Sequence, residues 1–170
     1  MTNDNGGRFW GKYRGVVSDI SDPRMLGRIK ATVPDVLGDQ ESGWALPAAP
    51  FGGSQAGFFA LPKTGAGVWI EFEHGDPDYP IWTGAWWGSE SEVPSVLLAP
   101  PYKKLLIQTE GGHTVVLDDT PGTGGITLTT SGGQKLVLSS TGIEIDNGSG
   151  ASLKLSGPQV SINGGALEVT

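Results

Sequence analysis

A cluster of carboxylates and one histidine lies near the middle of the chain, and side chains of these types can bind metal ions or transfer protons. It is followed closely by three tryptophans, which are the side chains on which sugars stack. Chemistry at this point would therefore be metal binding, acid–base catalysis or glycan recognition. The residues concerned are Glu71, Glu73, His74, Asp76, Asp78, Trp82, Trp86 and Trp87.

The spacing of these residues does not fit a metal or catalytic site. A zinc site needs several nitrogen or thiolate ligands, but the sequence has no cysteine and only His74 and His113. Asp76 and Asp78 lack the ligand and glycine spacing of an EF-hand loop, and glycoside hydrolysis needs carboxylates across a cleft. Gly75-Asp76-Pro77 instead has the composition of a tight turn between two strands. We predict no metal and no cofactor.

The tryptophans favour packing over ligand binding. Trp82 and Trp86 are four residues apart, so a regular strand would place both on one face and Trp87 on the other. Core packing or a subunit interface is the favoured use, and a glycan-binding surface that includes the loop at 52–57 is the alternative. No nucleophile or phosphate-binding motif occurs, and residues 118–122 have turn composition. The sequence predicts a protein that is not an enzyme.

Composition narrows the class of partner. The net charge of −7, with no basic block, argues against nucleic acid and anionic membranes. No apolar stretch near the N-terminus has the features of a signal peptide, and no apolar run is long enough for a membrane-spanning helix. We expect synthesis in the cytoplasm without a signal peptide.

The first part of the chain predicts a small closed barrel. Strand patterns occur at 12–20, 26–34, 67–74 and 81–87, with shorter strands and a glycine-rich loop expected at 42–62. No stretch shows a helical period over ten residues. All fourteen aromatic residues lie between Phe9 and Tyr102. We place this domain, with an N-terminal arm, at 1–100.

The second part, 101–170, predicts a repeat array of short strands. Eight segments recur every 7 to 12 residues, and apolar and polar residues alternate in most of them. One face is then aliphatic, and one chain has no second layer to cover it, so we predict burial against further copies, as a threefold prism or a dimer sandwich. The predicted interior residues are Ile126, Leu128, Leu136, Leu138, Ile143, Ile145, Leu153, Leu155, Val160, Ile162, Leu167 and Val169.

Four motifs in order resemble the spike proteins of contractile tails, a family that includes phage baseplate assembly protein V and the VgrG-type spikes of type VI secretion. They are carried by "YRGVVSDISDPRMLGRIKATVP", "WALPAAPFGG", "LPKTGAGVWIEFEHGDPDYPIWTGAWW" and "GGHTVVLDDTPGTGGITLTTSGG", and the resemblance covers about residues 11 to 135. The motif positions are Asp22, Pro23, Gly27, Arg28, Gly65, Gly67, Phe72, Glu73, Gly75, Asp76, Pro77, Pro80 and Gly84.

This resemblance implies an all-β protein with an OB-type barrel that forms a trimer, followed by an intertwined three-chain β-helix. Its partners would be its own copies, the tail tube, hub and baseplate proteins at the barrel, and a PAAR-type tip protein at the C-terminal end. It implies a central spike of a phage-like particle that crosses a membrane only by mechanical penetration. Roughly ten residues separate barrel and spike, so no lysozyme domain fits, and no His-x-His pair for iron occurs. The short form points to a phage or phage-like particle, with a type VI spike as the alternative.

Overall fold

The computed structural model describes residues 7–98 and 103–169, and it is almost entirely β-structure. The chain divides into two compact units, Met1–Glu92 and Val93–Thr170. In the described ranges no helix is long and apolar enough to cross a membrane.

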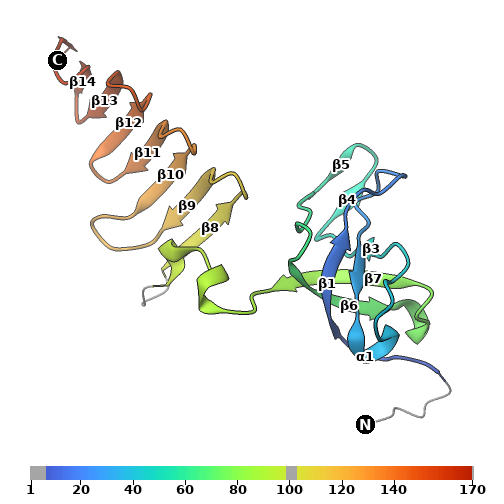
Figure 1. The fold of residues 1–170 in the computed structure, drawn as a ribbon. Coiled ribbons are helices and arrows are strands. Elements are labelled where there is room, and N and C mark those ends of the chain that lie inside the picture. The colour runs from blue at the N-terminus through green and yellow to red at the C-terminus, as the bar shows by residue number, and fades with distance from the viewer. Residues whose placement is uncertain (1–6, 99–102, 170) are drawn as a thin grey trace. The chain divides into compact units, whose positions relative to one another are not determined.

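The N-terminal unit is built on a five-stranded sheet in the order β2-β1-β6-β7-β3 (Figure 1). The pairs β2–β1, β1–β6 and β6–β7 are antiparallel, while β3 lies parallel to β7. The strand bounds are Tyr13–Asp19 for β1, Lys30–Thr32 for β2, Leu46–Pro47 for β3, Gly67–Phe72 for β6 and Pro80–Trp86 for β7.

The segment before β3 closes this sheet into a barrel. Residues Ile29 and Ala45 form an antiparallel bridge, and so do Thr32 and Glu41. The same segment therefore contacts β2 on one side and then joins β7 through β3 on the other, which leaves the sheet without a long open edge. The predicted closed barrel is confirmed.

Alternation along the strands fills the barrel with small aliphatic side chains. In β6, Val68, Ile70 and Phe72 are buried while their neighbours are half-exposed, which is the period of two expected for a strand with one wet face. The remaining buried apolar residues come from β1, β2 and the flanking segments: Val17, Ile29, Ala31, Val33 and Ala45.

Short elements complete this unit. The segment after β2 contains a one-turn helix, α1 (Pro34–Leu37), with proline at its first position and Gly38 at positive φ after it. The glycine-rich segment forms a small hairpin of β4 (Gly52–Gly53) and β5 (Ala56–Gly57). The shorter strands expected within 42–62 are β3, β4 and β5, and the ladder of the hairpin ends at the bond from Phe58 N to Phe51 O.

Within the described residues there are three 3-10 turns: η1 (Glu73–Gly75), η2 (Glu90–Glu92) and η3 (Ser95–Leu97).

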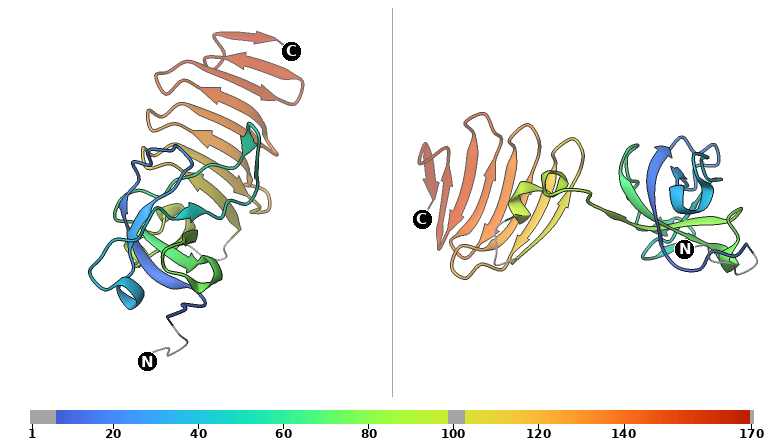
Figure 2. Two further views of the ribbon diagram at one scale, coloured as in Figure 1. Left: turned by 90° about the vertical axis from the view of Figure 1, so that its right-hand side faces the viewer. Right: turned by 60° about the horizontal axis from the view of Figure 1, so that its bottom comes forward.

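The C-terminal unit is one eight-stranded antiparallel meander, in which every strand pairs with its neighbours in sequence (Figure 2). All eight predicted strands are present. Their bounds are β8 Lys104–Gln108, β9 Thr114–Asp118, β10 Gly125–Thr129, β11 Lys135–Ser139, β12 Gly142–Asp146, β13 Ser152–Ser156, β14 Gln159–Ile162 and β15 Leu167–Val169.

Candidate functional site: an exposed aliphatic face and the loops of the barrel

The strand register of the C-terminal unit aligns aliphatic residues in two columns on one face of the sheet. Successive cross-strand partners face the same side of a sheet. The first column is Leu105, Leu117, Ile126, Leu138, Ile143, Leu155 and Val160, with Val169 next in register. The second is Ile107, Val115, Leu128, Leu136, Ile145, Leu153, Ile162 and Leu167. We call these fifteen residues without Val169 the aliphatic face.

All twelve residues predicted as trimer interior occupy these columns, although the side chain of Val169 lies outside the described part. The aliphatic face is exposed in the single chain, with Ile145 47% and Leu167 56% accessible. Such a continuous apolar surface marks an interaction site.

Four members of the face were missed from the sequence: Leu105, Ile107, Val115 and Leu117. Each lies in a run of three apolar residues, which hides the alternation that marked the later strands. The register of β8 with β9, and of β9 with β10, shows that these four residues lie on the same face as Ile126 and Leu128.

The opposite face of the sheet becomes polar along the chain. Its central column runs through Leu106, Val116, Thr127 and Val137, which are half-buried, and continues with the opposed pair Glu144 and Lys154. At its edge the ammonium of Lys104 lies 3.5 Å from the carboxylate of Asp118. Opposite charges on paired strands favour this register over a slipped one.

In the turn after β9, Asp118 accepts hydrogen bonds at Oδ1 from the backbone N–H and hydroxyl of Thr120. The hydroxyl of Thr120 is the main cause of the lowered pKa of Asp118. The prediction that residues 118–122 form a turn is confirmed.

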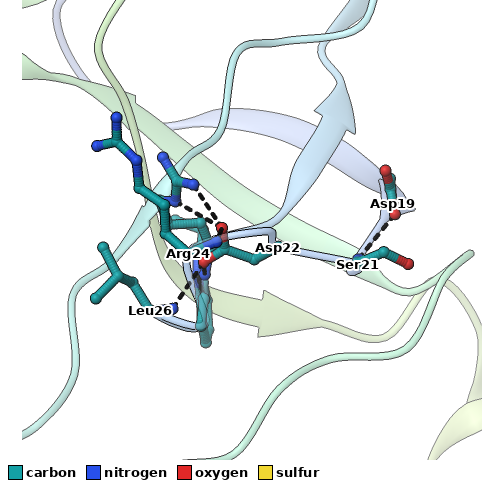
Figure 3. Close-up of polar contacts among 8 residues, drawn as sticks. Asp19, Ser21, Asp22, Arg24 and Leu26 are labelled. Atoms are coloured by element: carbon teal, nitrogen blue, oxygen red, sulfur yellow. Dashed lines mark hydrogen bonds and ion pairs between the residues drawn. The ribbon is translucent and has the colours of Figure 1, made fainter.

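In the N-terminal unit, Asp22 organises the loop between β1 and β2 (Figure 3). Its carboxylate accepts backbone N–H bonds from Arg24 at 3.0 Å and Leu26 at 2.8 Å. The guanidinium of Arg28 donates to the same carboxylate from Nε, at 3.0 Å, and from Nη2. The Asp22 side chain is only 4% exposed. We call residues 22–28 the Asp22 clasp.

The bonds in the Asp22 clasp all favour the charged carboxylate. The guanidinium of Arg28 is the largest cause that lowers the pKa of Asp22 far below its usual value, and the loop N–H groups lower it further against the opposing effect of desolvation. Pro23 occupies the second position of a turn closed by the bond from Met25 N to Asp22 O. The ion pair of Asp22 and Arg28 therefore stabilises the conformation of the loop.

Two motif glycines are explained by close approach of an aromatic ring. A Cβ on Gly67 would lie 2.6 Å from Cε2 of Trp86, so only glycine leaves room for that indole. A Cβ on Gly27, which has φ +73°, would lie 2.8 Å from Cε2 of Phe59. The Trp86 ring packs against Trp69, and the guanidinium of Arg14 lies 5.2 Å from the centroid of Trp86.

The acidic stretch forms the turn between β6 and β7 and holds the N-terminal arm. Asp76 accepts at Oδ1 from the N–H of Asp78 and pairs at Oδ2 with Arg8. The N–H of Phe9 donates to Gly75 O at 2.8 Å, and a Cβ on Gly75 would lie 3.2 Å from that nitrogen.

Other motif positions in this region serve the same turn and its flanking strands. Pro77 lies inside the turn closed by Tyr79 N to Asp76 O, and Pro80 is buried at the first residue of β7. The ring of Phe72 packs in tilted geometry against the rings of Phe9 and Tyr13, at centroid distances of 6.2 and 5.8 Å. Gly65 has φ +87°. Nothing in the described structure explains the side chain of Glu73.

A β-bulge corrects the interpretation of the tryptophans. Val68 pairs with Ala85 and Ile70 with Trp82, so β7 has one extra residue next to Gly84, whose φ is +147°. Trp82 therefore faces the core and donates from Nε1 to Gly27 O, whereas Trp86 packs on the outer face. The prediction that Trp82 and Trp86 share one face is wrong.

The acidic side chains do not converge on a reaction centre. In the ranges 7–98 and 103–169 no three His, Asp or Glu residues lie together as metal ligands would. His113 accepts at Nδ1 from Ser131 N at 3.3 Å, and so supports a turn. The chemistry of the described residues is that of assembly surfaces: a stapled barrel and a repetitive sheet with an apolar face.

Fold and surface thus define a class of protein, a small β-barrel joined to a strand-repeat domain that exposes an aliphatic face. Residues 13–87 match the family model described as the type VI secretion system/phage-baseplate injector OB domain. Residues 104–168 match the phage baseplate V C-terminal trimerisation domain. The chain belongs to the phage baseplate V family of VgrG-like spike proteins.

Curated relatives of this chain are VgrG proteins. The actin cross-linking toxin VgrG1 of Vibrio cholerae serotype O1 is 40% identical over 73 residues, covering 42% of this chain and 6% of that protein. The spike protein VgrG3 of V. cholerae serotype O1 is 34% identical over 90 residues, 50% of this chain and 9% of VgrG3. VgrG5 of Pseudomonas aeruginosa is 39% identical over 74 residues, 41% of this chain and 9% of VgrG5. The match spans less than a tenth of each relative.

Proposed function

We propose that this chain is the structural central spike of a phage-like contractile tail or injection system. Three copies associate through the aliphatic face of their C-terminal units. The barrel contacts the tail tube, hub and baseplate proteins, and the C-terminal end carries a PAAR-type tip protein. The work is mechanical: the stiff, hydrogen-bonded spike transmits the force of sheath contraction to the target envelope. No catalytic step is assigned to it.

The observation that carries this proposal is the unbroken aliphatic face. It crosses all eight strands, and no second layer of the same unit covers it. Apolar area gains about 25 cal/mol for each Å² removed from water, so association is strongly favoured. Among closed arrangements, a trimer agrees with the description of the matching trimerisation domain.

The net negative charge of the proposed trimer is consistent with passage through an anionic environment. Three chains carry three times −7, a formal charge of −21. The polar face of the sheet bears Glu144 and Lys154, while the aliphatic face has no charged member. A spike assembled in this way presents a hydrophilic exterior that resists non-specific adhesion to phosphate-rich surfaces.

The mass of the purified chain in solution tests the proposal. We expect about 53 kDa by light scattering, which is three times 17.7 kDa, at micromolar concentration. A folded monomer of 17.7 kDa under those conditions would contradict it. Electron microscopy of purified particles, with an antibody against the chain, should then place it at the baseplate end of a contractile tail.

A spike of the type VI secretion system is the second candidate. It is favoured by the VgrG relatives, which match this chain over 73, 90 and 74 residues. The two candidates differ in where the chain is found: in a sedimentable tail particle, or in culture medium dependent on type VI secretion. Fractionation of cultures with and without an active secretion system distinguishes them.

A further inference from the structure

The outer face of the barrel carries one cation that is paired with a carboxylate and, beside it, one that is not. On β1, Arg14 pairs in register with Trp69 of β6. Two residues earlier, the ammonium of Lys12 lies 2.9 Å from the carboxylate of Glu71 and donates to the hydroxyl of Thr83 at 2.7 Å. Arg14 is exposed, and among the described residues its guanidinium has no ion pair and no hydrogen-bond acceptor. Its N–H donors therefore lie in water.

Two indole rings hold the guanidinium of Arg14 in place. Its Cζ lies 5.8 Å from the ring centroid of Trp69 and 5.2 Å from that of Trp86. The Trp86 indole is itself fixed, because its Nε1–H donates to Val68 O at 3.1 Å and its ring lies against Gly67, where a Cβ would clash. The two indoles contact each other at a centroid distance of 6.5 Å. The guanidinium is therefore positioned before any partner binds, which reduces the entropy lost on binding.

The contacts with the indoles leave the hydrogen-bonding capacity of Arg14 unused. A guanidinium carries five N–H donors in a rigid fork, and the π-face of an indole supplies none of them with an oxygen acceptor. The acceptors that match this fork are planar or tetrahedral groups with two oxygens, namely carboxylates and phosphates, which accept two parallel N–H bonds. The chemistry of the ligand is thus an anion with paired oxygens.

The surroundings of Arg14 favour a protein carboxylate over a phosphate. Val16, which is 41% exposed, pairs with Gly67, and Gly67 pairs with Trp86, so an apolar row lies beside Arg14 on the same face. Packed tryptophan and arginine side chains whose neighbours exclude water often dominate the energy of protein–protein contacts. The net charge of −7 disfavours a phosphate-rich ligand. We call Arg14, Val16, Trp69 and Trp86 the Arg14 patch.

We propose that the Arg14 patch docks an acidic side chain of a different, neighbouring tail protein. The guanidinium of Arg14 binds the carboxylate, and apolar atoms of the partner cover Val16 and the two indoles. This inference rests on the proposed spike function, which supplies the neighbouring protein, and adds the place of contact on the barrel and the chemistry of the partner. The patch lies on β1, β6 and β7 (Figure 1) and shares no residue with the aliphatic face, so docking and trimer formation can be altered separately.

Purified contractile particles that carry variants of the full chain test the proposal. Arg14→Glu should lower the number of copies per particle at least tenfold, because it sets a like charge against the acidic partner. Arg24→Glu is the matched control, since Arg24 is also exposed and has no ion pair among the described residues, and it lies outside the patch. Quantitative mass spectrometry measures the copies, and both purified variants should retain the trimer mass and circular dichroism of the wild type. Equal incorporation of Arg14→Glu and Arg24→Glu would overturn the proposal.

Carbodiimide cross-linking identifies the source of the carboxylate and does not depend on the folding of Arg14→Glu. Arg14→Lys keeps the positive charge and introduces a primary amine. Carbodiimide joins this amine to a carboxylate in contact with it, forming an amide bond, and takes up the water that is lost to become a urea. Wild-type particles are the control for links formed by Lys12, which already lies beside Glu71.

We expect a cross-link from position 14 to an aspartate or glutamate of a different tail protein. A link only to a second copy of this chain, or no link in particles that contain Arg14→Lys, would overturn the proposal and leave the spike function intact. Absence of the wild-type chain from purified contractile particles would contradict the spike function itself, and the proposal would fall with it.

Discussion

Leu128→Ala tests the aliphatic face at a position in the middle of the sheet. Leu128 is 40% exposed in the single chain and lies between Val115 and Leu136 in its column. Full burial of a leucine side chain contributes about 1.5–3 kcal/mol. The 40% that association removes from water is therefore worth about 0.6–1.2 kcal/mol per chain.

Each of the three chains of a trimer loses this free energy of burial. Truncation should cost about 2–4 kcal/mol per trimer, which raises the equilibrium constant for dissociation about 30- to 700-fold. Any cavity left behind adds to this loss.

Sedimentation velocity across a guanidinium series measures the midpoint of trimer dissociation for the variant and the wild type. Thr127→Ala is the matched control, because Thr127 is the preceding residue of the same strand and faces the opposite side. Leu128→Ala should dissociate at lower denaturant, and Thr127→Ala should follow the wild type. Equal midpoints for all three proteins, or a shift in Thr127→Ala alone, would refute the assignment of the interior face.

Three further substitutions test the barrel. Asp22→Asn should lower the thermal midpoint at pH 5–8. Because the pKa of Asp22 is lowered in the folded protein, the charged carboxylate stabilises the fold above the unfolded pKa of about 3.9, and this stabilisation is lost as pH falls through the folded pKa. Thermal melts at pH 2–7 should therefore show that the difference in midpoint between wild type and variant shrinks below about pH 4. Gly67→Ala should displace the Trp86 indole and change tryptophan fluorescence, while Gly53→Ala, with no atom within 4 Å of its Cβ position, should not. Trp82→Phe removes the bond to Gly27 O and should cost about 1 kcal/mol in urea unfolding, a result that an unchanged midpoint would exclude.

Most of the secondary structure was predictable because local chemistry decides it. The period of two in segments such as "GIEID" and "SLKLS" specifies strands with one aliphatic face, and all eight C-terminal strands are where this pattern places them. Gly75-Asp76-Pro77 specifies a tight turn for equally local reasons, namely a residue free to adopt positive φ, a side-chain acceptor and a fixed φ.

Long-range pairing decided what the sequence could not show. The extra residue in β7 is visible only when Val68 and Ile70 are paired with Ala85 and Trp82, and it reverses the faces of two tryptophans. The run of apolar residues in "KLLIQ" likewise does not show which face of the sheet Leu105 and Ile107 occupy until the register with β9 is known.

The amino-acid sequence by itself determined that the chain is all-β, that its second half has a face one chain cannot cover, and which loops are turns. These properties follow from the order of apolar, polar and turn residues along short segments. Only the tertiary structure decided that Gly27, Phe59 and Trp82, from three separate segments, pack around one groove. The physical reason is that close packing depends on which distant residues share a surface, and that is set when the barrel closes.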